Sequence, residues 1–293
     1  MNTIRFEHHT SDMYINELCP FKIKYMKDCT HIVANWHRNL ELIYIVGGSA
    51  SLRRGSELCT VNKGDALVIS PETVHSIYSD KGVDFWFVIA DEGFLSENGL
   101  FAENNRFSMH GCDNETKEAI KAVILAYEDM QTNNSQTSVA KIRNAVLSLM
   151  IDVFEKYTEV LEVKKENRIT GEGYVKKAMQ YIGENCGRHI TVEEIALKLG
   201  ITKYYLSREF KKQTGETVIS YIGLVRCKRA EQLIMQGHTV TEAALESGFE
   251  SGSYFSQLYK KIKGIPPSEI KNMPAYHKST SRSTFDEEND PVS

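Results

Sequence analysis

No apolar run in this chain of 293 residues approaches the roughly 18 residues that a helix needs to cross a bilayer. The first residues, Met1–His9, lack the apolar segment that a secretory signal peptide requires. The six cysteines are scattered and form no C-x-x-C pair, which disfavours a disulfide framework and a cysteine zinc site. These absences predict a cytoplasmic protein with no membrane partner, whose thiols are reduced and mostly buried.

Negative charge predominates in the whole chain but not in its C-terminal part. The chain has 35 Lys and Arg against 39 Asp and Glu, whereas residues 171–278 have 16 against 11. A basic part joined to an acidic part is typical of a DNA-binding module attached to a domain that need not touch DNA. An ordinary soluble domain explains the same excess, so charge alone does not decide.

Two stretches of the basic part follow nearly the same pattern. Residues 191–200 (TVEEIALKLG) are matched 48 residues later by residues 239–248 (TVTEAALESG). A second matched pair follows, residues 204–212 (YYLSREFKK) and 253–261 (SYFSQLYKK), with the second turn one residue longer. A short helix, a glycine turn and a second helix with polar and basic residues are the pattern of a helix-turn-helix. The duplication predicts two such units, which would contact two neighbouring stretches of DNA groove.

Local signals support this pattern in both copies. Thr191 is followed by Glu194, and Thr239 by Glu242, a spacing that predicts a capping box at the start of each first helix. The remaining predictions concern helix ends and packing: left-handed turns at Gly200 and Gly248, helix caps at Thr202 and at Ser251 or Ser253, core anchors at Leu206, Phe210, Phe255 and Tyr259, and an apolar face that includes Leu245.

The outward positions of the two second helices form the predicted DNA-binding surface. Arg208 can bond guanine O6 and N7 with both arms of its guanidinium, and Gln257 can bond adenine N6 and N7 in the same way. Lysines near the ends of such helices meet phosphates. The predicted DNA-binding residues are Thr202, Lys203, Tyr204, Ser207, Arg208 and Lys211 in the first unit, and Ser251, Gly252, Ser253, Ser256, Gln257 and Lys260 in the second.

A single helix is predicted between the two units, over residues 218–236. At 1.5 Å per residue it is roughly 27 Å long, close to the roughly 34 Å between successive major grooves on one DNA face. We expect it to hold both recognition helices toward one side of the DNA. Arg226, Lys228 and Arg229 on this helix are either phosphate contacts or partners in salt bridges within the domain.

The C-terminal hundred residues resemble the DNA-binding domain of the AraC/XylS family of bacterial transcription regulators. The match departs from the family at Gln257, where many members carry arginine, and at Ala243, where isoleucine is usual. The residues that carry the resemblance are Ile195, Ala196, Gly200, residues 205–212, Gly215, Arg226, Arg229, Ala230, Ala243, Ala244, Gly248, Phe249, residues 253–256, residues 259–261, Gly264 and residues 266–268.

The N-terminal part has the short β-branched and aromatic runs of an antiparallel sandwich or barrel. Strands are predicted at residues 41–46, 65–69 and 84–89, and helical periodicity follows at 115–131 and 138–157. The fold class is therefore α+β multidomain. Its predicted parts are a barrel at 1–108, a helical segment at 109–161, a linker at 162–171, a domain of two helix-turn-helix units at 172–277 and a disordered tail at 278–293.

The barrel segment resembles a cupin in two places. Residues 35–42 (NWHRNLEL) are similar to the first cupin motif, and residues 64–75 (GDALVISPETVH) to the second. In metal-binding cupins, two histidines and a glutamate of the first motif join a histidine of the second. His37, Glu41 and His75 fall on matching positions, but Asn35 replaces the first histidine.

Three interpretations of this segment follow. The three matching residues could hold a zinc or iron ion, could be hydrogen-bonded in a core, or could line an effector pocket. The third is preferred, since sensory cupins of the AraC/XylS family commonly bind an organic effector without metal. We therefore predict no cofactor and no metal, and a pocket for a sugar-like molecule formed by Trp36, His37, Arg38, Glu41, His75 and Trp86.

The predicted function is that of a sequence-specific transcription regulator, an activator rather than an enzyme, controlled by a carbohydrate-related effector. The resemblance implies double-stranded DNA and RNA polymerase as partners, and a homodimer formed through the helices at 109–161. Two alternatives remain open: a metal-dependent cupin enzyme fused to a DNA-binding domain, and a barrel that serves only for dimerisation.

Overall fold

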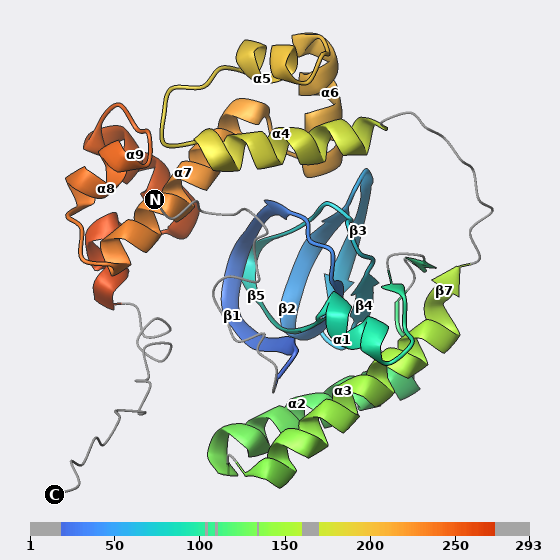
Figure 1. The fold of residues 1–293 in the computed structure, drawn as a ribbon. Helices are drawn as coiled ribbons and strands as arrows, with labels where there is room; N and C mark the ends of the chain where they lie inside the picture. The colour runs from blue at the N-terminus through green and yellow to red at the C-terminus, as the bar shows by residue number, and fades with distance from the viewer. Residues whose placement is uncertain (1–18, 103–104, 109–110, 134, 160–169, 273–293) are drawn as a thin grey trace, which may run out of the picture. The chain divides into compact units, whose positions relative to one another are not determined.

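The computed structural model describes residues 19–102, 105–108, 111–133, 135–159 and 170–272 (Figure 1). The chain forms two compact units, residues 1–224 and 225–293, which divide within one helix. The predicted tail at 278–293 lies outside the described residues, as does the predicted linker except for Thr170 and Gly171, which begin a helix. Among the described residues, no helix is both long and apolar enough to cross a membrane.

One antiparallel sheet forms the N-terminal part of the first unit. Its strand order is β1-β5-β2-β3, and β4 also pairs with β2. The predicted strands at 41–46 and 84–89 lie within β2 and β5 and are shorter than the observed ones, because the other half of each long strand carries more polar, partly exposed residues. The predicted strand at 65–69 begins one residue before β4. The strands are β1 (Phe21–Asn35), β2 (Leu40–Arg54), β3 (Glu57–Asn62), β4 (Ala66–Ile69) and β5 (His75–Ala90).

The long strands bend, so that the sheet curls around its own inner face (Figure 1). The register of β2 with β5 shifts between Ile45 and Gly47 and again between Gly48 and Ser51, and such bulges increase local bending. Gly48 has a φ of +74°, and a Cβ at this position would lie 2.7 Å from the carbonyl oxygen of Gly82, so glycine is required there. The inner face is filled by a hydrophobic core that includes Ile43, Ile45, Leu52, Ile69, Ile77, Phe85, Phe87 and Ile89.

The outer face of the sheet is covered by helices, which form a second hydrophobic core with it. The helices are α1 (Glu92–Glu97), α2 (Asn114–Asn133) and α3 (Gln136–Tyr157), and a short pair of strands, β6 (Arg106–Phe107) and β7 (Thr158–Glu159), lies at the end of α3. Helices α2 and α3 confirm the predicted helical pair, whereas α1 was not predicted. Their apolar stripes pack on sheet residues such as Leu42, Val68 and Val88, while Leu125 and Ile151 stay exposed.

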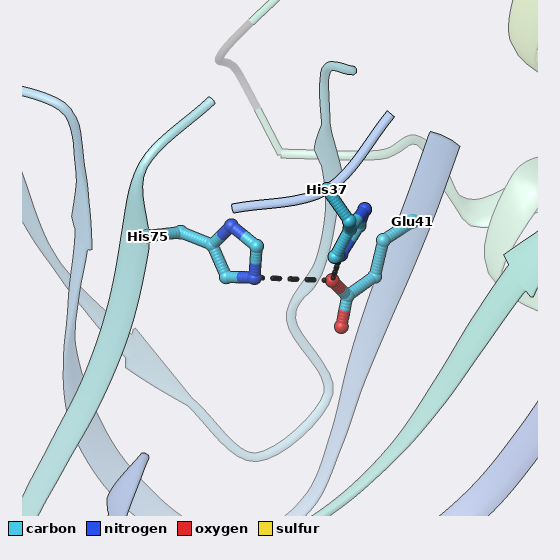
Figure 2. Close-up of side chains that lie close together, drawn as sticks. All are labelled: His37, Glu41 and His75. Atoms are coloured by element: carbon cyan, nitrogen blue, oxygen red, sulfur yellow. Dashed lines mark hydrogen bonds and ion pairs between the residues drawn. The ribbon is translucent and has the colours of Figure 1, made fainter. Parts of the chain in front are cut away.

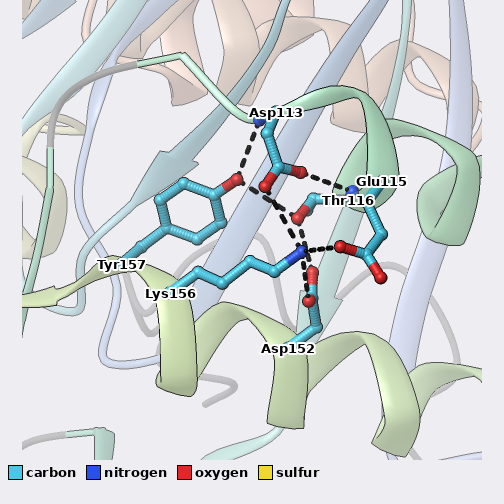
Figure 3. Close-up of polar contacts among 6 residues, drawn as sticks. All are labelled: Asp113, Glu115, Thr116, Asp152, Lys156 and Tyr157. Carbon is cyan, nitrogen blue, oxygen red and sulfur yellow. Dashed lines mark hydrogen bonds and ion pairs between the residues drawn. The ribbon is translucent and has the colours of Figure 1, made fainter.

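A polar network joins the start of α2 to the end of α3 (Figure 3). Thr116, which is fully buried, donates to the Asp152 carboxylate and accepts from the Tyr157 hydroxyl at 3.1 Å. Exposed ion pairs add little stability, whereas buried hydroxyls require partners, so Thr116 is the structural centre of the network. Around it, Lys156 Nζ lies 2.7–3.3 Å from three carboxylates, those of Asp113, Glu115 and Asp152.

Both predicted helix-turn-helix units are present. The first comprises α5 (Val192–Lys198) and α6 (Lys203–Thr214), and follows α4 (Gly171–Asn185), a helix that was not predicted. The second comprises α8 (Val240–Glu246) and α9 (Gly252–Lys263), followed by the 3-10 helix η2 (Pro267–Asn272). Helix α7 (Val218–Met235) confirms the predicted helix between the units and ends one residue earlier than predicted.

The predicted core anchors of both units are confirmed. Leu206, Phe210, Phe255 and Tyr259 are fully buried. In the second unit, two alanines of α8 lie in a core of aromatic and aliphatic side chains, which lets α9 pack closely on α8. The prediction for Leu245 is wrong, because this side chain is 54% exposed and the apolar face of α8 consists of Ala243 and Ala244 together with the partly buried Val240.

The predicted helix caps and glycine turns of the two helix-turn-helix units are present at all positions but one. Gly200 and Gly248 have φ values of +69° and +89°, as left-handed turns require. The Thr239–Glu242 capping box is complete. At Thr191, the hydroxyl accepts from the Glu194 amide, but the Glu194 carboxylate binds elsewhere, so the predicted second box is only half formed.

Candidate DNA-binding surface and effector site

One face of helix α6 packs in the core of its unit, and the opposite face is exposed. The Thr202 side chain accepts from the Tyr205 amide and thereby caps the helix, as predicted. Its buried face carries Leu206 and Phe210, and the Phe210 ring packs on Tyr221 with centroids 5.2 Å apart. This packing leaves the predicted DNA-binding positions outside: Ser207 is partly exposed, and Thr202, Lys203, Tyr204, Arg208 and Lys211 are exposed.

The guanidinium of Arg208 is oriented by its neighbours. Its Nε and Nη2 donate to the Glu209 carboxylate at 3.2 and 2.9 Å, and it lies over the Tyr205 ring, 5.4 Å from the centroid. The Glu209 side chain is nearly buried, whereas the Arg208 side chain is 57% exposed. A mostly buried carboxylate therefore holds an exposed guanidinium at the surface. Glu209 was not predicted from the sequence as a functional residue.

Helix α9 repeats this design with different side chains. Its cap is Ser251, which accepts from the Tyr254 amide, so the alternative cap at Ser253 is not used. Its buried face carries Phe255 and Tyr259, whose rings pack at 5.6 Å. The predicted positions again lie outside: Gly252 and Ser256 are partly exposed, and Ser251, Ser253, Gln257 and Lys260 are exposed.

Positive charge gathers at the C-terminal ends of both helices. The last turn of α6 carries Lys211 and Lys212, and that of α9 carries Lys260, Lys261 and Lys263. Lysines at this end complement the helix dipole and also offer contacts to phosphate groups. The two surfaces therefore combine hydrogen-bonding groups in the first turns with cations at the end, the arrangement that reads base edges and binds the backbone.

In the curled sheet, His37, Glu41 and His75 form a buried cluster (Figure 2). The Glu41 Oε2 atom lies 2.8 Å from His37 Nε2 and 3.2 Å from His75 Nε2, and all three side chains are at most 8% exposed. Glu41 lies near the start of β2 and His75 at the start of β5, where the ladder pairs His75 with Arg54 at the other end of β2. The β1–β5 ladder pairs His75 with Asn35, two residues before His37, and closure of the sheet brings Glu41 to the two histidines.

The environment shifts the pKa values of Glu41 and His75. Burial alone would raise the pKa of Glu41, but the hydrogen bonds and positive charges of His37 and His75 outweigh burial and hold this pKa well below its usual value. Burial likewise tends to lower the pKa of His75, but the Glu41 carboxylate outweighs it and raises the pKa. Glu41 is therefore an anion in this site.

The other predicted effector residues are placed differently. Arg38 is exposed and Trp36 is partly buried. Trp86 pairs with Tyr44 across β5 and β2, whereas Glu41 and Ile43 on β2 pair with Ile89 and Phe87. Because side chains alternate between the faces of a strand, Trp86 lies on the outer face with the second core, and packs on Tyr127 of α2 at 6.2 Å. The prediction that Trp86 shares one pocket with His37, Glu41 and His75 is therefore wrong.

Two residues near the cluster were missed by the sequence analysis. Lys22 is buried, with its Nζ 5.4 Å from the centroid of the Phe87 ring on the inner face. It pairs with Ile89, which pairs with Glu41 on its other side, so Lys22 and Glu41 share a face. A lysine within the apolar run Phe21–Ile23 was the available signal. Asn39 was also missed, although its carbonyl binds His37 and its side chain accepts from the Glu92 amide.

Comparison with known proteins agrees with this architecture. Residues 29–93 match the family model described as AraC-like ligand binding domain, and residues 195–273 match the model described as helix-turn-helix domain. An uncharacterized HTH-type transcriptional regulator in the cgkA 5′ region of Pseudoalteromonas carrageenovora is 32% identical over 114 residues, which are 39% of this chain and 68% of the relative. The chain belongs to the AraC family of transcription regulators.

Two further relatives are informative. The lactose operon transcription activator of Staphylococcus xylosus is 26% identical over 159 residues, 54% of this chain and 55% of the relative. A solved structure of a variant of apo ToxT from Vibrio cholerae has a TM-score of 0.51 at 16% identity, with 87% of this chain and 97% of that chain covered. The second likeness concerns the fold alone, and it agrees with the predicted sheet domain followed by a helical helix-turn-helix domain.

Proposed function

We propose that this regulator is an activator that binds two unlike DNA half-sites and responds to a carbohydrate-related effector in its N-terminal sheet domain. The observation that carries the proposal is the pair of recognition helices, each anchored by two buried aromatic or aliphatic residues and each with polar groups exposed at its start. The protein then works in the cytoplasm, where the DNA lies, and its partner in activation is RNA polymerase. No reaction is assigned to it.

Base recognition is assigned to one residue in each helix. Arg208 donates two hydrogen bonds to a guanine in the first half-site, and Gln257 pairs with an adenine in the second. Both side chains are exposed, and the contact of Arg208 with Glu209 and Tyr205 directs its guanidinium outward. The remaining predicted positions contact phosphates or neighbouring base edges.

Dimerisation is assigned to the helices α2 and α3. Most of their apolar residues are used against the sheet, but Leu125 and Ile151 are 65% and 42% exposed. Exposed large apolar side chains on neighbouring helices favour association with a second copy. A dimer would place four helix-turn-helix units on a repeated DNA site.

The effector is assigned to the inner side of the sheet domain. The polar groups of His37, Glu41 and His75 are the candidates for orienting a hydroxyl-rich molecule, and the lactose operon activator among the relatives supports a sugar. Effector binding must favour one arrangement of the protein energetically in order to control transcription.

Selection of DNA from a random pool by the full-length protein tests the DNA-binding part of this proposal. The expected product is a site with two different conserved blocks. The double variant Arg208→Ala/Gln257→Ala should lose both blocks, whereas Lys177→Ala, which removes an exposed charge from α4, should retain them. A single conserved block, or two blocks retained by the double variant, would refute the assignment.

A thermal-shift screen of mono- and disaccharides tests the effector part independently. A sugar that binds the folded state raises the melting temperature in proportion to the logarithm of its concentration. The shift should disappear in Glu41→Gln and persist in Lys177→Ala. No stabilisation by any sugar would instead support a domain that serves dimerisation only.

A further inference from the structure

The hydrogen bonds of the buried histidines define where their protons lie. His37 Nδ1 is 2.9 Å from the Asn39 carbonyl oxygen, and His75 Nδ1 is 2.9 Å from the Thr73 carbonyl oxygen. A carbonyl oxygen only accepts hydrogen bonds, so each Nδ1 carries a proton. In a neutral imidazole the other nitrogen, Nε2, then has a lone pair and no proton.

Both Nε2 atoms face the same carboxylate oxygen, Oε2 of Glu41, at 2.8 and 3.2 Å. Two lone pairs directed at an anionic oxygen repel it, so neutral imidazoles alone do not explain this geometry. A proton on Glu41 could be donated to one histidine but not to both. Two solutions remain: both histidines are imidazolium ions, or one cation lies between the three atoms.

A single cation suits the surroundings better than two imidazolium ions. The histidine rings are 5.2 Å apart, and both side chains are 4% exposed. Two like charges at this distance away from water repel each other strongly. A metal ion removes this repulsion because each imidazole then stays neutral and uses its Nε2 lone pair as a ligand.

The donor set also fits a metal ion in detail. Metal-binding histidines usually donate their second ring N–H to a backbone carbonyl or a carboxylate, as both do here. Bonds of about 2.0 to 2.1 Å to a tetrahedral zinc separate neighbouring ligand atoms by about 3.3 Å. The observed 2.8 and 3.2 Å are close to this spacing, and the three ligand atoms lie within 4.8 Å of one another.

Asn35 provides a separate observation beside the cluster. It pairs with His75 across β1 and β5 and therefore shares its face of the sheet. Its Oδ1 atom is buried and has no hydrogen-bond partner among the described residues. Water bound to a metal ion is a strong hydrogen-bond donor, and a donor of this kind would satisfy the oxygen.

We propose that His37, Glu41 and His75 bind one divalent transition-metal ion of the zinc class, with one coordination position left open to an oxygen donor. From the sequence we preferred a site without metal, since sensory cupins of the AraC/XylS family commonly bind an organic effector without one. The hydrogen-bond directions reverse that preference. Two neutral imidazoles and one carboxylate with an open position form a donor set that zinc accepts. The proposed metal site rests on these contacts alone, so it is independent of which effector binds and of DNA binding.

Other residues of the chain could also bind the metal ion, and variants can test for them. Burial raises the pKa of the Cys112 and Cys227 thiols to about 12, so these thiols are weak ligands near neutral pH. His8 and His9 are adjacent in the sequence and offer an adventitious site. The variant His8→Gln/His9→Gln removes them, and His31→Gln removes a histidine of β1 that is not part of the cluster.

The test titrates the full-length protein, freed of metal by a chelator, with Zn²⁺ against a chromogenic competitor and with Co²⁺ as a spectroscopic probe. We expect one equivalent of tightly bound Zn²⁺, a visible Co²⁺ band of low-coordinate type, and a higher melting temperature with metal. His37→Gln and His75→Gln should each weaken Zn²⁺ binding at least about 100-fold. The two control variants should bind as the wild type does.

A gain of affinity keeps the proposal testable if these variants fold poorly. Asn35→His adds a fourth nitrogen next to His75 and should tighten Zn²⁺ binding at least about 10-fold. Absence of a tightly bound equivalent in the wild-type protein would overturn the proposal, as would equal affinity in His37→Gln, His75→Gln and the wild type. Loss of binding in His8→Gln/His9→Gln would show an adventitious site only. Failure of any sugar to bind would refute the effector proposal and leave this result unchanged.

Discussion

The two helix-turn-helix units have the same architecture, but different residues stabilise and expose their surfaces. In the first unit, Arg208 is held by the neighbouring Glu209 carboxylate; in the second, the corresponding surface carries the neutral Gln257. The cores also differ, since α8 buries Ala243 and Ala244 where α5 buries Ile195 and Ala196. The shared residues account for the common fold of the two copies, and the proposed difference in base recognition rests on Arg208 and Gln257.

The largest expected effect is on the core of the second unit. Phe255→Ala removes a fully buried ring from the small core of that unit and should reduce its free energy of unfolding by about 3 to 5 kcal/mol. Chemical denaturation should then show an early transition for residues 225–272, while the transition of the compact unit formed by residues 1–224 is retained.

Leu245→Ala is the matched control for this change, because Leu245 is largely exposed. It should change the free energy of unfolding by no more than about 0.5 kcal/mol. Equal losses in Leu245→Ala and Phe255→Ala would contradict the packing described for α8 and α9.

The next effect is on DNA affinity. Arg208→Ala and Gln257→Ala should each reduce the free energy of binding to the selected site by about 1 to 3 kcal/mol. Only Arg208→Ala removes a positive charge, so it alone should also reduce the dependence of affinity on salt concentration. Titrations at several salt concentrations measure both quantities. Equal salt dependence in the two variants would contradict a contact between the Arg208 charge and DNA.

A smaller effect on stability is expected from substitutions at the N-caps of α5 and α8. Thr239→Ala removes a hydroxyl that takes part in a complete capping box, whereas Thr191→Ala removes a hydroxyl whose partner glutamate binds elsewhere. Each substitution should cost about 1 kcal/mol of stability. We expect the larger loss at Thr239, because the Glu242 carboxylate also loses its bond to the Thr239 hydroxyl, 2.8 Å in length. Thermal unfolding of each variant measures the difference.

The smallest effect depends on pH and concerns Glu194. Hydrogen bonds from Arg188 and Tyr181 lower the pKa of this partly exposed carboxyl to about 2. A pKa lowered by folding stabilises the protein above the unfolded value, about 4.5, and this contribution is lost as the pH falls toward 2. The melting temperature of the wild type should therefore exceed that of Glu194→Gln at pH 6, and the difference should shrink between pH 4.5 and pH 2. A difference that grows on acidification would contradict the assigned partners.

The sequence predicted repeated local features better than it predicted contacts between distant residues. Caps at Thr202 and Ser251, turns at Gly200 and Gly248 and four anchors are local consequences of helix geometry, and all are confirmed. The capping motif at Thr191 was predicted but is only half formed, because Arg188 and Tyr181, three and ten residues before it, compete for the Glu194 carboxylate. A motif gives the positions of two groups but not the partners that compete for them.

The proposed effector site was harder to predict for the same reason. Motif spacing identified His37, Glu41 and His75, which do meet, although strand pairing brings only the two histidine segments together and Glu41 joins them through closure of the sheet. Trp86 was assigned to the same pocket on residue type, and strand alternation places it on the opposite face. The sequence shows that Trp86 points to the opposite face of its strand from Phe85 and Phe87. Which of the two faces is the inner one depends on helices α2 and α3, which cover the outer face.

The central claim is that the two units recognise different bases, and it is tested most directly by the position-by-position base preference of three proteins. Selection from a random DNA pool, followed by sequencing, should be carried out with the wild type, Arg208→Ala and Gln257→Ala. The account predicts that Arg208→Ala relaxes a guanine position in one block and Gln257→Ala an adenine position in the other, with the opposite block unchanged in each case. Relaxation of the same positions by both variants, or of none by either, would contradict it.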